Sequence, residues 1–116
     1  MQALVQPLTW LLGIVFILIG AAGFFMDPLI VFEVDPVHNI IHILSGIVAL
    51  ALAGTYANAR MYLMVFGAVY GLVAVLGFTV EGGNILNLIV VNTADNYLHA
   101  GIAVACLTVG LGSPKA

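Results

Sequence analysis

At 116 residues the chain is long enough for one domain, and 64% of it is hydrophobic while only 6% is charged. A soluble domain carries about 25% charged residues, so this composition excludes an ordinary water-soluble protein and indicates a chain that lies in a lipid bilayer. The net charge of −3, from two basic and five acidic residues, excludes the basic surface with which proteins bind nucleic acid.

Four apolar stretches follow one another along the chain, at residues 8–25, 37–53, 61–80 and 94–111. Each approaches the roughly 20 residues that a helix needs to cross a bilayer. The sequence therefore predicts an all-α integral membrane protein, a bundle of four transmembrane helices that forms a single membrane domain over residues 1–116.

Residues that favour the start of a helix precede three of these stretches. Asp35 followed by Pro36 is a capping residue followed by one suited to the first helical position. Asn92 or Thr93 is expected to cap the fourth helix, and Pro7 is expected to begin the first.

The charged residues favour one orientation in the membrane. Four spans place both ends of the chain on one side, and Arg60 and Lys115 fall on that side. The acidic residues fall on the other side: Asp27, Glu33, Asp35, Glu81 and Asp95. Because basic residues collect on the cytoplasmic side, both termini are expected in the cytoplasm of a bacterial inner membrane or a thylakoid-type membrane.

The first and third stretches resemble each other, as do the second and fourth. At an offset of 54 residues the chain matches Gly13 with Gly67, Phe16 with Tyr70 and Gly23 with Gly77. At an offset of 57, which implies three extra residues around 81–83, it matches Asn39 with Asn96 and His42 with His99. These matches predict two tandem helix hairpins, at about 7–58 and 61–112, that enter the membrane in the same direction. Their polar clusters should then lie at the same depth.

The second and fourth stretches open with polar residues that share one helix face. His38 and His42 are four residues apart, as are Asp95 and His99, so each pair lies on one face. Further along the face of the histidine pair the residues are small, beginning with Gly46. Small residues let helices approach closely in lipid, so this face should point toward other helices, near the outer boundary of the hydrocarbon.

Two interpretations of these polar residues stay open. In the first, an interhelical hydrogen-bond network holds the hairpins in register, formed by Asn39, Asn96, Asp95, His42 and His99. In the second, histidine binds a cofactor, because neutral imidazole is an axial ligand of haem iron and binds other metals. His42 and His99 would clasp a haem from both sides, or one of them would ligate a chlorophyll, with His38 as a further candidate.

A bare metal ion, a transport path and a catalytic residue are not indicated. His38, His42, His99 and Asp95 offer three imidazoles and a carboxylate, but their spacing resembles no standard zinc motif. We therefore expect no metal site from the spacing. A path for protons or ions is hard to build, because the inner halves of all four stretches carry no Asp, Glu, Lys, Arg or His.

Two further features concern packing. Gly67 and Gly71 form a Gly-x-x-x-Gly pair, which is typical of close helix packing against a sibling helix or another subunit. The segments 29–34 and 85–91 are apolar, rich in β-branched residues and too short to span a membrane. They are expected either to lie along the membrane surface or to pair as short strands over the histidines.

Two related signatures suggest a family. Pro36-Val-His38-Asn39-x-x-His42 opens the second stretch, and Asn92-Thr-Ala-Asp95-Asn96-x-x-His99 opens the fourth. The combination resembles a bacterial four-helix membrane-protein family known as domain of unknown function 4383, along nearly the whole chain. The resemblance implies the four-helix fold and the importance of these histidine, asparagine and aspartate residues, and it implies no activity.

The sequence thus favours a non-enzymatic membrane protein that serves as an accessory or scaffold subunit of a larger membrane complex. The first alternative is a tetrapyrrole-binding subunit of a respiratory or photosynthetic assembly, with His42 and His99 as axial ligands of haem or chlorophyll. The second alternative is a small transporter.

Overall fold

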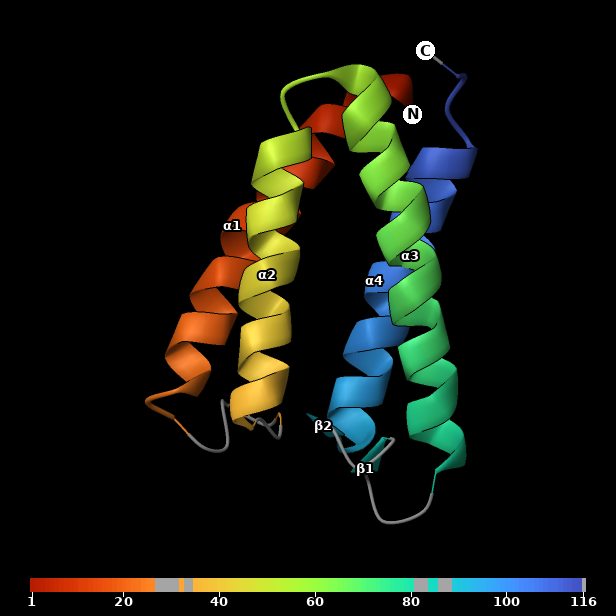
Figure 1. Ribbon diagram of the computed structural model, residues 1–116. Helices are drawn as coiled ribbons and strands as arrows, with labels where there is room; N and C mark the ends of the chain where they lie inside the picture. The colour runs from red at the N-terminus through yellow and green to blue at the C-terminus, as the bar shows by residue number, and fades with distance from the viewer. Residues whose placement is uncertain (27–31, 33–34, 81–83, 86–88, 116) are drawn as a thin grey trace.

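Four long helices make up most of the molecule, which we describe from a computed structural model (Figure 1). The structure describes residues 1–26, 32, 35–80, 84–85 and 89–115. The elements in chain order are a short 3-10 helix η1 (Gln2–Leu4), α1 (Val5–Gly23), α2 (Pro36–Leu52), α3 (Tyr56–Thr79), β1 (Asn84–Ile85), β2 (Ile89–Val90) and α4 (Thr93–Leu111). The all-α class with four helices is confirmed.

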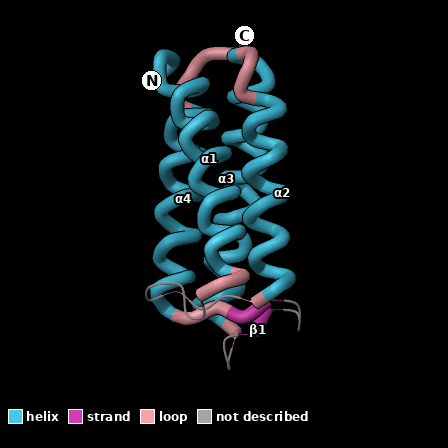
Figure 2. Tube along the Cα trace, turned by 90° about the vertical axis from the view of Figure 1, so that its left-hand side faces the viewer, coloured by secondary structure: helices cyan, strands magenta, loops and turns pink. Residues whose placement is uncertain are grey.

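The helices pair in sequence order. α1 packs mainly on α2 and α3 mainly on α4, so the chain forms a first hairpin and a second hairpin, which also contact each other through α1 and α3. Both chain ends lie at one end of the bundle, and the two strands lie at the opposite end (Figure 1). The molecule is elongated, with principal extents of 41 × 28 × 20 Å, and the helices run along its length (Figure 2).

The predicted helix starts are right for two helices. The Asp35 carboxylate accepts a hydrogen bond from the His38 backbone N–H at 2.8 Å, with Pro36 at the first helical position of α2. Asn92 caps α4 and forms a reciprocal capping box with Asp95, in which each side chain accepts from the other's backbone N–H.

Two other helices begin earlier than expected. α1 begins at Val5, so the expectation that Pro7 starts it is wrong. Because the first four N–H groups of a helix have no acceptor within it, Pro7 is tolerated inside the first turn. α3 begins at Tyr56 rather than at residue 61, because the Thr55 hydroxyl caps it by accepting from the Asn58 N–H.

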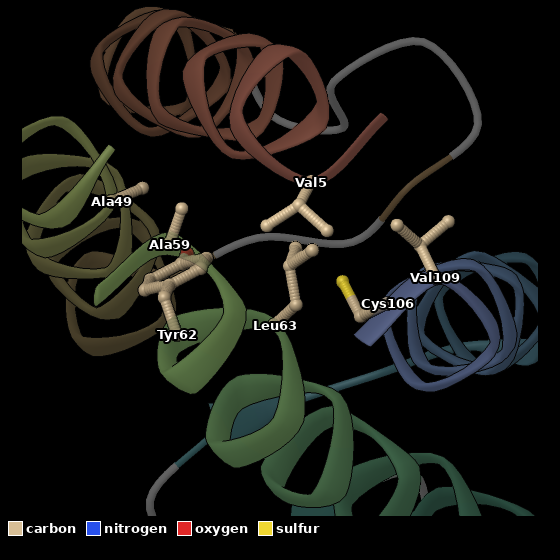
Figure 3. Packing of buried hydrophobic residues seen from close by; sticks show 7 residues of the cluster. All are labelled: Val5, Ala49, Ala59, Tyr62, Leu63, Cys106 and Val109. Atoms are coloured by element: carbon tan, nitrogen blue, oxygen red, sulfur yellow. The ribbon is translucent and has the colours of Figure 1, made fainter. Parts of the chain in front are cut away.

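The apolar core closes the end of the bundle where the termini lie. All four helices contribute to this cluster, which consists of Val5, Ala49, Ala59, Tyr62, Leu63, Cys106 and Val109 (Figure 3). The C-terminal tail is bound to the same end, since Arg60 Nε donates to the Ser113 carbonyl at 3.1 Å and the Tyr56 hydroxyl donates to the Pro114 carbonyl. A second, smaller cluster of Phe16, Tyr70 and Ala103 lies next to it.

Glycines bring the two helices of each hairpin close together. A Cβ at Gly13 in α1 would lie 2.6 Å from Leu50 in α2, and a Cβ at Gly67 in α3 would lie 2.9 Å from Leu107 in α4. Nearer the strand end, a Cβ at Gly23 would overlap the Asn39 amide oxygen. A Cβ at Gly77 would likewise overlap the Asn96 amide oxygen.

The other predicted packing glycines also lie between helices of one hairpin. A Cβ at Gly46 would lie 2.6 Å from Ile17, and one at Gly71 would lie 3.5 Å from the Ala103 Cβ. The Gly67 and Gly71 face is therefore occupied by α4, the sibling helix.

The outer surface carries many large apolar side chains. Within the described part of the chain, the stretches Gln2–Gly23 and Tyr56–Thr79 are long and apolar enough to cross a membrane, and Pro36–Leu52 is a shorter apolar helix. The exposed apolar residues of the two long helices include Leu11, Ile14, Leu18, Val65, Leu72 and Val75.

The short segment near the histidines forms a strand pair. β1 and β2 pair antiparallel, with Asn84 opposite Val90 and Ile85 opposite Ile89. The buried Ile85, Ile89 and Val91 pack on Val73 and Leu76 of α3. The other expected segment, 29–34, lies outside the described residues except for Phe32, as do the predicted extra residues around 81–83.

The glycine contacts lead to a stability prediction. We expect Gly77→Ala to lower the free energy of unfolding by about 1–3 kcal/mol, because the added methyl group overlaps the buried Asn96 amide and displaces it from its place between α3 and α4. Gly101→Ala is the matched control in α4, where a Cβ meets nothing within 4 Å, and it should raise stability by about 0.5–1 kcal/mol through helix propensity.

Reversible unfolding in detergent, followed by circular dichroism, measures both variants against the parent. Equal stabilities for Gly77→Ala and Gly101→Ala would show that the close approach of α3 and α4 is wrong.

Candidate metal centre

The three histidines of the chain lie together at the end of the bundle away from the termini. The ring centroids are 4.4 Å apart for His38 and His42, 5.5 Å for His38 and His99, and 6.1 Å for His42 and His99. Their exposed fractions are 2%, 5% and 1% in chain order, so all three are buried. One ligand nitrogen from each ring lies within 4.8 Å of the other two.

The helix caps position these rings. Asp35 sets the start of α2 so that His38 is its third residue and His42 its seventh. The Asn92 and Asp95 capping box sets the start of α4 so that His99 is likewise its seventh residue. Because residues four apart share a helix face, His38 and His42 point to the same side of α2, toward His99.

Two aromatic rings lie directly beneath the histidines. Phe16 of α1 stacks on His42 with ring centroids 5.6 Å apart, and Tyr70 of α3 lies 5.5 Å from His99. Phe16 and Tyr70 also stack on each other at 5.1 Å. They separate the imidazoles from the rest of the core, and the Tyr70 hydroxyl shares a 2.9 Å hydrogen bond with the Ser45 hydroxyl.

Two of the buried histidines have ring nitrogens without a hydrogen-bond partner in the described part of the chain. His42 Nε2 and both ring nitrogens of His99 make no hydrogen bond to any residue that the structure describes. A buried polar atom left unpaired is unfavourable by about 1–3 kcal/mol, so such atoms call for an explanation. Neutral imidazole is the commonest metal ligand, and a metal ion would pair one nitrogen of each of these rings.

The two asparagines lie against glycines within their own hairpins. The amide oxygen of Asn39 faces Gly23, and that of Asn96 faces Gly77. Neither oxygen accepts a hydrogen bond from the described residues. The network predicted to join these asparagines to His42, His99 and Asp95 stays a prediction.

Two cavities flank the histidines. The α2–α3 cavity, of about 190 Å³, is lined by all three imidazoles, by Ser45 and Tyr70, and by apolar residues that include Ile89 of β2. The α1–α4 cavity, of about 400 Å³, is reached by His42 and Asp95, and its other walls are apolar.

The distances suit a single transition-metal ion. Two nitrogens bound to one zinc ion lie roughly 3.3 Å apart, as follows from Zn–N bonds of about 2.0–2.1 Å and a tetrahedral angle. Nitrogens already within 4.8 Å reach that geometry through small rotations of the side chains. The spacing of the histidines along the chain resembles no standard zinc motif. The reason is that α2 supplies two of the three nitrogens and α4, far along the chain, supplies the third.

A haem held from both sides by His42 and His99 does not suit the same geometry. The His38 ring lies 4.4 Å from one and 5.5 Å from the other, closer than these two rings lie to each other. It therefore occupies the space that a macrocycle between them would need.

The sequence did not single out Ser45 as part of the site. Tyr70 and Phe16 were noticed only as a matched pair between the first and third stretches, and that match was the available signal for their common role.

Comparisons with known proteins identify the family. No match to the chain was found among curated proteins or among solved structures. The sequence profile of the family described as domain of unknown function (DUF4383) matches residues 6–112, which include all three histidines and both helix caps. The chain therefore belongs to the DUF4383 family, as its two polar signatures suggested.

Proposed function

We propose that the protein is a membrane-embedded metal-binding protein, in which His38, His42 and His99 hold one transition-metal ion near one surface of the bilayer. The observation that carries this proposal is the meeting of all three histidines of the chain at one buried point. Imidazole suits zinc, copper, iron and nickel, so the ion belongs to this group rather than to magnesium or calcium.

Insertion of all four helices in the membrane is part of the proposal. The exposed apolar side chains and the two helical stretches of sufficient length support it. The positions of Arg60 and Lys115, at the end of the bundle where the termini lie, support a cytoplasmic location for that end. The metal site then lies on the outer side, near the caps at Asp35 and Asn92.

A tandem repeat explains why the two hairpins resemble each other in detail. Pairs of contacts recur at the offsets of 54 and 57 residues that relate the sequences. The approach of Gly13 to Leu50 in the first hairpin corresponds to that of Gly67 to Leu107 in the second. The contact of Gly23 with Asn39 corresponds in the same way to that of Gly77 with Asn96. The contact of Phe16 with His42 corresponds to that of Tyr70 with His99. We infer that the two hairpins are parallel copies related by an axis along the membrane normal.

A tetrapyrrole with a single axial ligand is the second candidate. The α1–α4 cavity supports it, because this apolar space of about 400 Å³ is reached by His42. An absorption spectrum of the protein in mild detergent would then show a Soret band, which His42→Ala removes and His99→Ala keeps. A colourless preparation argues against this candidate.

The accessory-subunit role stays a prediction that is compatible with metal binding. Its docking surface is not the Gly67 and Gly71 face, which α4 covers. The size of the complex in native membranes tests the role, since a lone monomer would oppose it. The transporter alternative also stays a prediction.

The proposed orientation gives a labelling prediction. In a Cys106→Ala background, Lys115→Cys should react with a membrane-impermeant maleimide from the cytoplasmic side only. Met26 is exposed three residues beyond the C-terminal end of α1, and Met26→Cys should react from the outer side only. Labelling of both positions from one side would contradict four spans.

Metal binding gives a second prediction. Zinc added to protein purified without a histidine tag should bind one ion per chain and raise stability, by about 2.7 kcal/mol when free zinc is 100 times the dissociation constant. His38→Ala, His42→Ala and His99→Ala should each weaken binding by at least about 10- to 100-fold, because loss even of groups behind the ligands has that effect.

Cys106→Ala is the control. It removes a buried thiol, a group that can bind zinc but does not belong to the proposed site, and it should leave the zinc affinity unchanged. Isothermal titration calorimetry measures these affinities. Equal zinc binding by the parent and by His99→Ala would overturn the proposed site.

A further inference from the structure

The two cavities beside the histidines are lined by corresponding residues of the two hairpins. The α1–α4 cavity contains Leu12, Val15, Phe16, Ile19, His42, Asp95, Leu98 and Ile102. The offset of 54 relates the four α1 positions to positions in α3, and the offset of 57 relates His42 to α4 and the three α4 positions back to α2. The corresponding residues all line the α2–α3 cavity, and they are, in the same order, Phe66, Val69, Tyr70, Val73, His99, His38, Ile41 and Ser45. The two spaces are therefore equivalent in position and differ in what their walls carry.

The walls differ most in polarity. Where the α1–α4 cavity has Phe16 and Ile102, the α2–α3 cavity has Tyr70 and Ser45, whose hydroxyls bond to each other at 2.9 Å. The α2–α3 cavity is also the one that all three imidazoles line. Hydroxyl groups and metal ligands thus meet in one of the two spaces.

We infer that the bound ion keeps one coordination position open toward the α2–α3 cavity, and that a small exchangeable ligand binds there with a hydrogen bond from the Tyr70 hydroxyl. This inference rests on the proposed metal site. The ligand class is water, hydroxide or an anion of a few atoms. Three protein ligands with an open fourth position are typical of reactive rather than structural zinc sites.

The cavity volume sets the size of the ligand. About 190 Å³ holds up to about six molecules of water size, since one water takes roughly 30 Å³ of liquid. When the Ser45 hydroxyl donates to the Tyr70 oxygen, the Tyr70 proton is free to point at a ligand on the ion. A hydrogen bond from the Tyr70 hydroxyl to an anionic ligand would be stronger than one between two neutral groups, because the acceptor is charged.

Cobalt(II) and azide provide the probe. Protein purified without a histidine tag is loaded with cobalt(II), whose visible absorption bands report the number and kind of its ligands, and is then titrated with azide. We expect saturable changes of these bands in the parent protein. Tyr70→Phe should bind cobalt(II) with unchanged affinity and bind azide about 10-fold more weakly, as expected for one lost hydrogen bond to an anion.

Tyr62→Phe is the matched control. Tyr62 is also a buried tyrosine of α3, but its hydroxyl donates to the Ser45 backbone carbonyl at 2.9 Å and it does not line the cavity. Its azide affinity should equal that of the parent. An effect of Tyr62→Phe as large as that of Tyr70→Phe would mean that loss of any buried hydroxyl in α3 acts through packing, and would overturn the role of Tyr70.

The remaining outcomes separate the two proposals. Failure to bind cobalt(II) would remove the metal site itself. Cobalt(II) that binds but gives no spectral change with azide would keep the metal site and overturn the open position. Azide that binds equally to Tyr70→Phe and the parent would overturn the hydrogen bond from Tyr70.

Discussion

Three imidazole rings buried side by side are the constraint around which this end of the molecule is arranged. Each ring brings polar nitrogens into a region surrounded by apolar side chains, where unpaired polar atoms are unfavourable. The Phe16 ring stacks on His42 and the Tyr70 ring lies tilted beside His99, and the caps at Asp35 and Asn92 fix the starts of the helices that carry the histidines. The helix caps, the aromatic packing and the candidate metal ligands therefore all lie at the strand end of the bundle.

The core of the bundle is unevenly distributed along its length. All four helices interlock in the cluster at the termini, where Tyr62 and Leu63 are almost completely buried. Toward the strands, the α2–α3 and α1–α4 cavities replace close packing. A further apolar pocket of about 320 Å³ lies between α1 and α4 at the terminus end, so the cavities beside the histidines differ from it in their imidazole walls rather than in their size.

Much of the fold was predictable because local signals carry it. Apolar stretches gave the four helices, and Asp35 with Pro36 gave the start of α2 to the residue. The start of α3 was missed, because Thr55 precedes the polar residues Asn58 and Arg60, which do not read as part of an apolar stretch. Pro7 was misplaced, because a proline fits anywhere in the first turn of a helix.

The site was predictable only in part, because it depends on distances between helices. The shared face of His38 and His42 follows from a spacing of four residues, but their approach to His99 depends on how the two hairpins pack. The predicted repeat pairs His42 with His99 and also pairs His38 with Asp95, so the sequence suggested a symmetrical pair of imidazoles. The third imidazole breaks that symmetry and changes a site suited to two ligands into one suited to three.

The division of the histidines between hairpins has a mechanical consequence. The hairpins are joined covalently by the short turn between α2 and α3, at the end where the interlocked core lies. His38 and His42 belong to the first hairpin and His99 belongs to the second. All three lie at the end of the hairpins opposite this turn. A ligand bound by all three rings would therefore connect the two hairpins at the end opposite the turn between α2 and α3, where a change in the angle between the hairpins displaces the rings most.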